Sequence, residues 1–201
     1  MTEETLRETL PKSWVWTTLG EMQLDLSQSI NPVKTPEKTF ELYSVPKFEE
    51  GIPEIVLGKG IGSNKITIQN ECVLLCKINP QINRVWIVMS DSPNQKIGST
   101  EWIPFFKIDK LSPKYIQYFL RKNTFRNFLA SNVSGVGGSL MRIRSATFSK
   151  YPFPLAPSAE QNRIVGKVEE LFSFLDAGTE SLRKVQAQLK RYRQAVPKIR
   201  F

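Results

Sequence analysis

The side chains that most often do chemistry are scarce in this sequence. It contains no histidine, which excludes a Ser-His-Asp triad, a Cys-His pair and an imidazole general base. Its two cysteines, Cys72 and Cys76, cannot complete a four-ligand zinc site without histidine. Their spacing places both on one face of a strand, where two small buried side chains are favoured over a metal site or a disulfide.

Motifs of DNA-modifying enzymes are also missing. No Asp or Glu is followed two positions later by Lys, which excludes the core motif of a common nuclease class. Asn31-Pro32 and Asn79-Pro80 are not followed by the Pro-Tyr/Phe of an amino-methyltransferase. Paired carboxylates such as Glu49 and Glu50 are typical of a solvated turn. We therefore predict a protein that is not an enzyme and needs no cofactor; a DNA-modifying enzyme is a distant alternative.

Positive charge is concentrated in one part of the chain. The 201 residues include 28 Lys and Arg against 19 Asp and Glu, a net charge of +9. Residues 1–109 hold 11 basic and 14 acidic side chains, whereas residues 110–150 hold eight basic side chains and no acidic one. Because solvated surfaces normally mix both signs, this carboxylate-free segment indicates a polyanionic partner, with nucleic acid the leading candidate. A merely basic face is the alternative.

The first hundred residues predict a β-rich unit. Apolar, aromatic and β-branched runs typical of strands occupy residues 14–19, 72–78, 84–89 and 104–108. Residues 79–83 predict a turn, residues 27–54 predict loops and edge strands, and residues 2–9 fit a short amphipathic helix. The pattern as a whole indicates a compact sheet or barrel-like domain.

A glycine-rich basic segment, Gly58-Lys59-Gly60-Ile61-Gly62-Ser63-Asn64-Lys65, precedes a strand pattern at residues 66–68. It lacks the third glycine of G-x-G-x-x-G and is not a Walker A loop, so it does not predict a nucleotide cradle. A hairpin turn and a DNA-facing loop are both open.

The cationic segment predicts a helix followed by extended chain. Ser112-Pro113 has the N-cap hydroxyl and first-turn proline of a helix start, and the helix is expected to continue to a glycine-rich break at residues 134–139. Residues 141–144 alternate apolar and cationic side chains, as in a half-exposed strand. The proline-rich residues 151–157 predict an extended linker.

The rest of the chain predicts one long helix. Ser158 and Gln161 have the spacing of a capping box. Apolar residues then follow alternating steps of four and three, interrupted by Gly178, which is the spacing of a coiled-coil seam. This chain contains no second helix of matching length, so we expect pairing with another chain or repeat; packing on its own sheet is the alternative. The seam residues are Ile164, Val168, Leu171, Leu175, Leu182, Val185, Leu189, Tyr192 and Val196.

Four motifs, in this order, resemble those of one protein family. They are Leu10-Pro11-Lys12-Ser13-Trp14 with Leu19-Gly20-Glu21, then Leu74-Leu75-Cys76-Lys77-Ile78-Asn79-Pro80, then Val136-Gly137-Gly138-Ser139 with Arg142-Ile143, and finally Pro154-Leu155-Ala156-Pro157-Ser158-Ala159-Glu160-Gln161-Asn162-Arg163-Ile164-Val165. From residue 10 to about residue 196 the chain resembles one half of the DNA-specificity (S) subunit of type I restriction–modification enzymes.

The resemblance implies an α/β (α+β) fold: a β-rich DNA target recognition domain at residues 1–157 and a long helix at residues 158–201 for dimerisation and docking of the methyltransferase subunit. In this family the S subunit is not catalytic. It recognises double-stranded DNA and directs adenine methylation by the modification subunit, and cleavage by a restriction subunit. The opening of the chain is polar and acidic, and no apolar run is long enough for a membrane span, so we expect a cytoplasmic protein without a membrane partner.

Only one of the family's two repeats is present, which predicts a half subunit or a fragment. A half subunit rebuilds the two-fold arrangement by forming a homodimer through its seam, and we favour that dimer. An RNA-binding module on a coiled-coil stalk fits the charge but not the four motifs. A plain coiled-coil adaptor leaves the cationic segment unexplained.

The DNA contacts are predicted from charge and expected loop position, because no base-reading motif of the family transfers to single positions. For phosphates we predict Lys114, Arg121, Lys122, Arg126, Arg142 and Arg144. For base edges we predict Lys59, Asn64, Lys65, Gln95 and Lys96.

Overall fold

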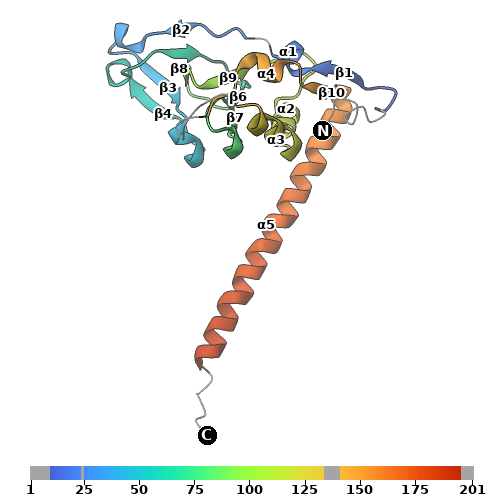
Figure 1. The fold of residues 1–201 in the computed structure, drawn as a ribbon. Helices are drawn as coiled ribbons and strands as arrows, with labels where there is room; N and C mark the ends of the chain where they lie inside the picture. The colour runs from blue at the N-terminus through green and yellow to red at the C-terminus, as the bar shows by residue number, and fades with distance from the viewer. Residues whose placement is uncertain (1–9, 24, 134–140, 196–201) are drawn as a thin grey trace. The chain divides into compact units, whose positions relative to one another are not determined.

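The fold was analysed in a computed structural model, which describes residues 10–23, 25–133 and 141–195 (Figure 1). The chain divides into two units, Met1–Gln161 and Asn162–Phe201. The helix expected at residues 2–9 and the glycine motif at residues 136–139 lie outside the described residues. Within the described part of the chain, no helix is long and apolar enough to cross a membrane. The predicted α+β class, with a long C-terminal helix, is confirmed.

Two sheets form most of the first unit. The larger has the order β2-β5-β8-β3-β4, in which β3 and β8 are parallel and the other neighbours are antiparallel. The smaller is the antiparallel sheet β7-β6-β9. The strands are β2 (Ser29–Ile30), β3 (Thr39–Tyr43), β4 (Glu54–Leu57), β5 (Lys65–Thr67), β6 (Val73–Cys76), β7 (Val85–Ile87), β8 (Gln95–Ser99) and β9 (Trp102–Phe105).

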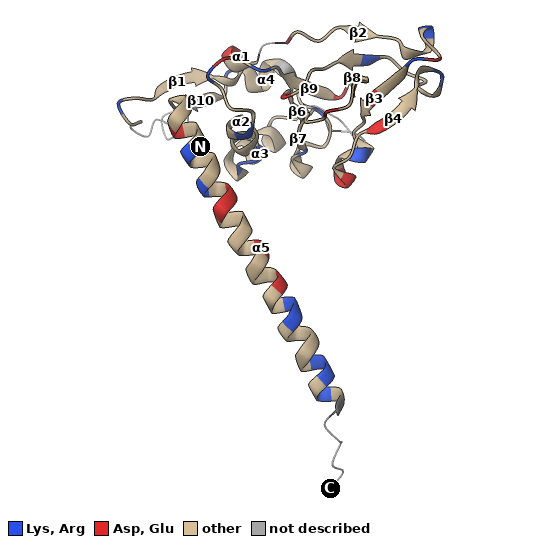
Figure 2. Ribbon diagram, turned by 180° about the vertical axis from the view of Figure 1, so that it is seen from behind, with Lys and Arg blue, Asp and Glu red and all other residues tan. Residues whose placement is uncertain are grey.

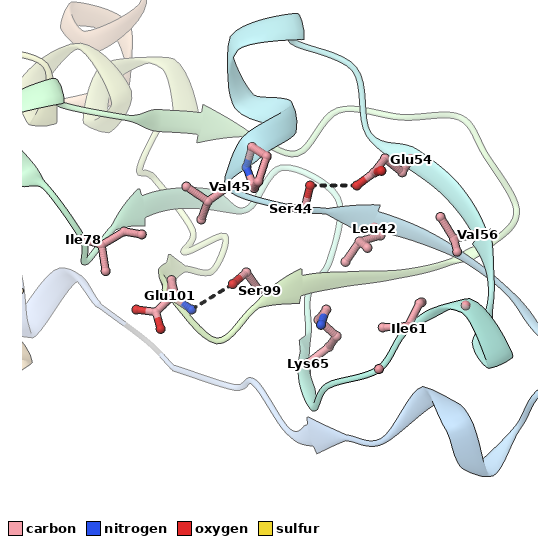
Figure 3. A pocket seen from close by; sticks show the side chains of 13 residues that line it. Leu42, Ser44, Val45, Glu54, Val56, Ile61, Lys65, Ile78, Ser99 and Glu101 are labelled. Atoms are coloured by element: carbon pink, nitrogen blue, oxygen red, sulfur yellow. Dashed lines mark hydrogen bonds between the residues drawn. The ribbon is translucent and has the colours of Figure 1, made fainter. Parts of the chain in front are cut away.

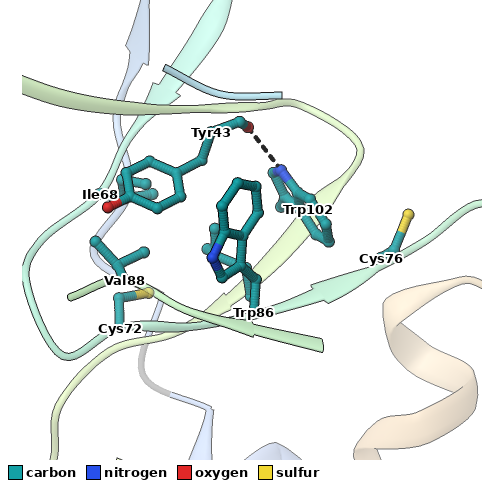
Figure 4. Close-up of a cluster of buried hydrophobic side chains, with 8 residues drawn as sticks. Tyr43, Ile68, Cys72, Cys76, Trp86, Val88 and Trp102 are labelled. Carbon is teal, nitrogen blue, oxygen red and sulfur yellow. Dashed lines mark hydrogen bonds between the residues drawn. The ribbon is translucent and has the colours of Figure 1, made fainter. Parts of the chain in front are cut away.

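An aromatic core lies between these sheets (Figure 4). Trp86 packs edge-to-face on Tyr43, with ring centroids 4.9 Å apart, and the Trp102 indole N–H donates to the Tyr43 carbonyl at 2.8 Å. Cys72 and Cys76 are both buried in the same cluster as free cysteines. The predicted role of the cysteines as small buried side chains is therefore confirmed.

Four 3₁₀ turns and two short helices complete the sheet region. The turns are η2 (Pro32–Lys34), η3 (Pro46–Glu50), η4 (Gly58–Gly60) and η5 (Pro80–Ile82), and the helices are α1 (Leu19–Met22) and α4 (Ser145–Ser149). The turn predicted at residues 79–83 is confirmed as η5, which Asn79 and Asn83 flank in the left-handed conformation. The strand predicted at residues 104–108 begins earlier, as β9. Residues 141–144 form only an isolated bridge, from Arg142 to Ile78, so the strand predicted there is wrong.

The single helix predicted after Ser112 is two helices, α2 (Pro113–Leu120) and α3 (Asn123–Ser131). Ser112 does cap α2, accepting a hydrogen bond from the Tyr115 N–H at 3.5 Å. The chain breaks at Arg121-Lys122, where Lys122 takes an extended conformation before α3, and both helices contribute aromatic residues to one cluster. Phe119 of α2 and Phe125 of α3 pack there, with ring centroids 6.3 Å apart.

The linker predicted at residues 151–157 is wrong, because its centre is strand β10 (Pro152–Leu155). It pairs antiparallel with β1 (Val15–Thr18), with Pro152 opposite Thr18 and Pro154 opposite Trp16. Alternate residues of an antiparallel strand direct their N–H groups away from the partner, so two prolines spaced by two leave the ladder intact.

The long helix α5 (Ser158–Ala195) does not begin with the predicted capping box. The buried Gln161 amide instead binds three backbone groups: it donates to the carbonyls of Lys110 and Ala156, at 2.8 and 2.7 Å, and accepts from the Ser112 N–H at 2.8 Å. The Trp14 indole N–H also donates to the Glu160 carboxylate. The helix start thus belongs to the first unit.

A buried ion pair joins the two parallel strands. Glu41 is fully buried and lies opposite Lys96 in the β3–β8 register, with its Oε2 3.5 Å from the Lys96 Nζ. The Tyr43 hydroxyl donates to the Glu41 Oε1 at 2.7 Å, and burial together with this carboxylate raises the pKa of Tyr43. A buried carboxylate held in this way leaves its partners unsatisfied when it is removed.

We expect Glu41→Ala to lower the free energy of unfolding by about 3–5 kcal/mol, because it leaves the Lys96 ammonium buried without a counter-ion. Denaturant unfolding measures the loss. Glu50→Ala is the control, since it breaks the exposed Lys47–Glu50 pair and is expected to leave the transition unchanged. A Glu41→Ala transition that coincides with that of the unmodified chain would contradict this prediction.

Candidate nucleic-acid interface

The cations of the two-helix segment are exposed at its turn. Arg121 and Lys122 occupy the junction between α2 and α3, and Arg126 lies one turn into α3. Arg121 and Lys122 are exposed and Arg126 is half-buried. The Lys122 ammonium lies 5.4 Å from the centre of the Phe119 ring, which holds its stem against the apolar cluster. The break that splits the helices therefore presents cations to solvent.

These three side chains have no carboxylate within ion-pair distance among the described residues. Several lysines elsewhere differ, as with Lys47 on Glu50, Lys107 on Glu71 and Lys167 on Glu170. Figure 2 shows the cations and carboxylates along the ribbon. Charge that is not neutralised internally is available to an external polyanion.

The other predicted phosphate contacts have different surroundings. Arg144 is exposed just before α4, and Lys114 is half-buried in the first turn of α2. Arg142 is exposed, but its guanidinium donates to the Glu101 carboxylate at 2.5 Å. A phosphate at Arg142 would compete with that carboxylate, so we expect Arg142 to contribute less than Arg121.

The predicted base contacts lie around the larger sheet, and the loop position expected for three of them is wrong. Lys65 begins β5, and Gln95 and Lys96 begin β8. The Lys96 ammonium is held by Glu41 and by the Ser92 carbonyl at 3.0 Å. The Gln95 Oε1 accepts from the Lys38 ammonium at 2.6 Å. Base contact by these strand residues stays a prediction.

Lys65 lies beneath the glycine-rich segment rather than at its surface (Figure 3). It is 9% exposed, lines a pocket of about 440 Å³, and donates to the backbone carbonyl and hydroxyl of Ser63. Burial lowers the pKa of Lys65. The glycine-rich segment at residues 58–65 is not the turn of a hairpin, since β8 and β3 separate β5 from β4 in the sheet. That alternative is therefore wrong.

Asn64 and Lys59 are the predicted base contacts that do lie outside strands. Both are exposed, and the Lys59 ammonium is 3.4 Å from the Glu37 carboxylate. Asn64 lines a polar groove of about 480 Å³ whose other lining residues are Ser29, Ile30, Asn31, Lys34 and Thr35. Lys34 was not predicted as a DNA contact from the sequence. The signal that could have indicated it is its position among polar residues shortly after Asn31-Pro32.

No group of three or more His, Cys, Asp or Glu residues in the described ranges is arranged to hold a metal ion. Burial raises the pKa of the Cys72 thiol to about 12 and also raises the pKa of Cys76. Because the thiolate is the reactive form, both cysteines are poor nucleophiles at neutral pH.

The second unit is the continuation of α5. The whole of α5 has 38 residues and a length of about 57 Å. The predicted seam residues Leu171, Leu175, Leu182, Val185, Leu189 and Tyr192 are all at least 50% exposed, whereas Ile164 and Val168 are partly exposed. Val196 lies outside the described residues. A row of exposed apolar side chains of this length indicates a surface that a partner covers.

An α+β domain with unneutralised cations, followed by a helix with an exposed apolar seam, fits the class of nucleic-acid-recognition subunits that assemble through helices. No protein-family profile matches the sequence. The chain is 23% identical over 191 residues to the type I restriction enzyme EcoEI specificity subunit of Escherichia coli. The matched region covers 88% of this chain and 32% of that protein.

Two solved structures share its fold. One is the HsdS subunit of Thermoanaerobacter tengcongensis, with a TM-score of 0.78, 21% identity, and coverage of 97% of this chain and 53% of that one. The other comes from a structural study of complex assembly in a type I R-M system, with a TM-score of 0.73, 24% identity, and coverage of 92% and 47%.

The resemblance predicted from the four motifs is thereby confirmed: the homologues of this chain are type I restriction enzyme specificity subunits. The chain spans about a third of the Escherichia coli relative and about half of each solved structure. That coverage fits one recognition domain and one helix.

Proposed function

We propose that this chain recognises a specific sequence in double-stranded DNA as a half specificity subunit of a type I restriction–modification system. Residues 1–157 are the target recognition domain, and residues 158–201 are the helix that pairs with a partner helix and docks the modification subunit. The observation that carries this proposal is the carboxylate-free segment 110–150, whose Arg121, Lys122 and Arg126 have no ion-pair partner in the described residues.

In this proposal the chain is not itself catalytic. It supplies the DNA contacts, and modification and restriction subunits supply methylation and cleavage, on DNA in the cytoplasm. The buried cysteines with raised pKa values and the absence of histidine support a binding role over a catalytic one. The likeness to specificity subunits supports the same assignment.

We further propose that the helix pairs antiparallel with that of a second copy. Charge along α5 supports this orientation: Glu169, Glu170, Asp176 and Glu180 precede residue 182, whereas every charged residue of 182–195 is basic. A parallel pair would place five cations beside five, while an antiparallel pair centred near Gly178 places the basic end beside residues 162–175, where Arg163 and Lys167 are balanced by Glu169 and Glu170. Gly178 lies midway between Asn162 and Ala195, at the centre of such a pair.

A map of modified bases tests this function. DNA is taken from cells that carry the cognate modification subunit, with and without this chain. We expect a methylated motif that appears only with the chain and whose two halves are inverted copies. If no chain-dependent motif appears and the purified complex binds a random-sequence duplex no better than a competing double-stranded RNA, DNA recognition is contradicted. A motif with two unlike halves would contradict the homodimer alone.

A further inference from the structure

The polar groove beside Asn64 has the composition of a DNA contact. Among its lining residues two have hydroxyls (Ser29 and Thr35), two have carboxamides (Asn31 and Asn64), Lys34 is the cation and none is a carboxylate. Hydroxyl, amide and lysine groups are the side chains that bind phosphate oxygens and base edges. An acidic ligand would meet no repelling charge within this lining.

The side of the groove that carries Lys34 and Thr35 is supported from behind by η4. In η4, the Gly58 N–H donates to the Lys38 carbonyl at 2.9 Å and the Lys59 N–H donates to the Pro36 carbonyl at 3.1 Å, which ties η4 to the segment that follows η2. A side chain at Gly58 would place its Cβ 2.3 Å from the Thr35 carbonyl oxygen, so this close approach requires glycine. The Thr35 side of the groove is therefore fixed by its close packing on Gly58.

The segment that carries Asn64 is anchored at both ends. Ile61 is 3% exposed in the core cluster with Phe40 and Ile97, and Lys65 holds the Ser63 carbonyl from beneath. Between these anchors Gly62, Ser63 and Asn64 are exposed. Lys65 thus positions the turn that carries Asn64, and the Asn64 side chain is exposed on that turn.

The pairing of β2 with β5 places the carboxamides of Asn31 and Asn64 at the same end of these two strands. Ile30 of β2 pairs with Lys65 of β5, so Asn31 and Asn64 are the next residues in that register. The Asn31 Oδ1 accepts from the Val33 N–H at 3.2 Å. No hydrogen bond engages the Asn64 amide in the described residues, so both its donor and its acceptor are available. An asparagine amide matches the N6 and N7 edge of adenine.

We propose that this groove is a second DNA-contact surface, separate from the cationic helices: Lys34 binds a phosphate of one strand, and Asn64 bonds to the adenine of a neighbouring A·T pair. This inference rests on the proposed function and names a specificity-determining residue for it. Neither residue contributes to the core, since both are exposed.

The test is selection by the full chain, with its modification subunit, from a library of random-sequence DNA duplexes. We expect Asn64→Ala to relax one A·T position, to weaken binding of the duplex selected by the unmodified chain roughly 5- to 150-fold, and to leave the salt dependence unchanged. We expect Lys34→Ala to weaken binding of all duplexes alike and to shallow the salt slope by about one.

Two control variants are matched to these. Lys47→Ala removes one positive charge from another 3₁₀ turn, and Gln69→Ala removes an exposed carboxamide beyond the other end of β5. If Asn64→Ala and Lys34→Ala behave like these controls while replacement of Arg121, Lys122 and Arg126 strongly weakens binding, the groove inference is overturned and the proposed function stands. An effect of Lys34→Ala alone would overturn base contact by Asn64. If the unmodified complex binds no duplex, the proposed function itself fails.

Discussion

Replacing Arg121, Lys122 and Arg126 together by Ala is expected to weaken duplex DNA binding about 500-fold at 0.1 M salt. Each phosphate contact releases about 0.9 of a counterion, so three lost contacts remove about 2.7 from the slope of log affinity against log salt. Between 1 M and 0.1 M salt that difference amounts to about 2.7 decades of affinity. Titration of a labelled duplex at a series of salt concentrations measures both quantities.

The loss should be the same for every DNA sequence, because phosphates do not differ between base pairs. Replacing Lys47, Lys107 and Lys167 by Ala is the control, since it removes the same charge from side chains that already contact carboxylates. An equal loss of affinity in the two triple variants would mean that net charge, rather than this helix turn, drives binding. An unchanged salt slope in the first variant would contradict the phosphate assignment.

Local sequence patterns predicted the elements that depend on residues close together in the sequence. Val73–Cys76 reads as a continuous apolar run, and each of its four residues is buried. The Ser112-Pro113 helix start is confirmed because a hydroxyl cap and a first-turn proline act within a few residues. Burial of the cysteines followed from the same run.

Pairing between distant segments could not be read from such patterns. The β1–β10 ladder joins residues separated by more than 130 positions, and its two prolines look like a linker until the partner strand is known. Lys65 and Lys96 look like exposed loop residues for a related reason. Only the β5 and β8 pairings show that Lys65 supports a turn from beneath and that Lys96 faces the buried Glu41.

The motifs that identified the family have structural roles within the first unit. Leu19 is fully buried, a Cβ at Gly20 would lie 2.9 Å from Ser149, and Glu21 completes the capping box of α1 with Thr18. Gln161 binds three backbone groups. Such residues stabilise the local fold of the first unit, and none of the interactions described for them involves a predicted DNA contact. The motifs therefore indicated the function but not the residues that recognise bases.

Replacing both Leu182 and Leu189 by Lys is expected to convert the chain from a dimer of about 46 kDa, twice 23.0 kDa, to a monomer. Both leucines lie in the seam and are more than 50% exposed in the single chain. Burying a leucine contributes about 1.5–3 kcal/mol, and each dimer buries two copies of each residue. Lysine also adds charge to the basic end of the helix. Light scattering on the eluting protein measures the molar mass.

Ala187 and Gln194 provide the matched control, because they lie on the opposite face of the same helix and can also be replaced by Lys. That variant adds the same charge in the same turns and is expected to stay dimeric. A monomer in both variants would assign the effect to charge, and a dimer in both would place the interface elsewhere. Because a half subunit needs two copies to contact two half-sites, the seam variant should also lose chain-dependent methylation while its recognition domain still binds a single half-site.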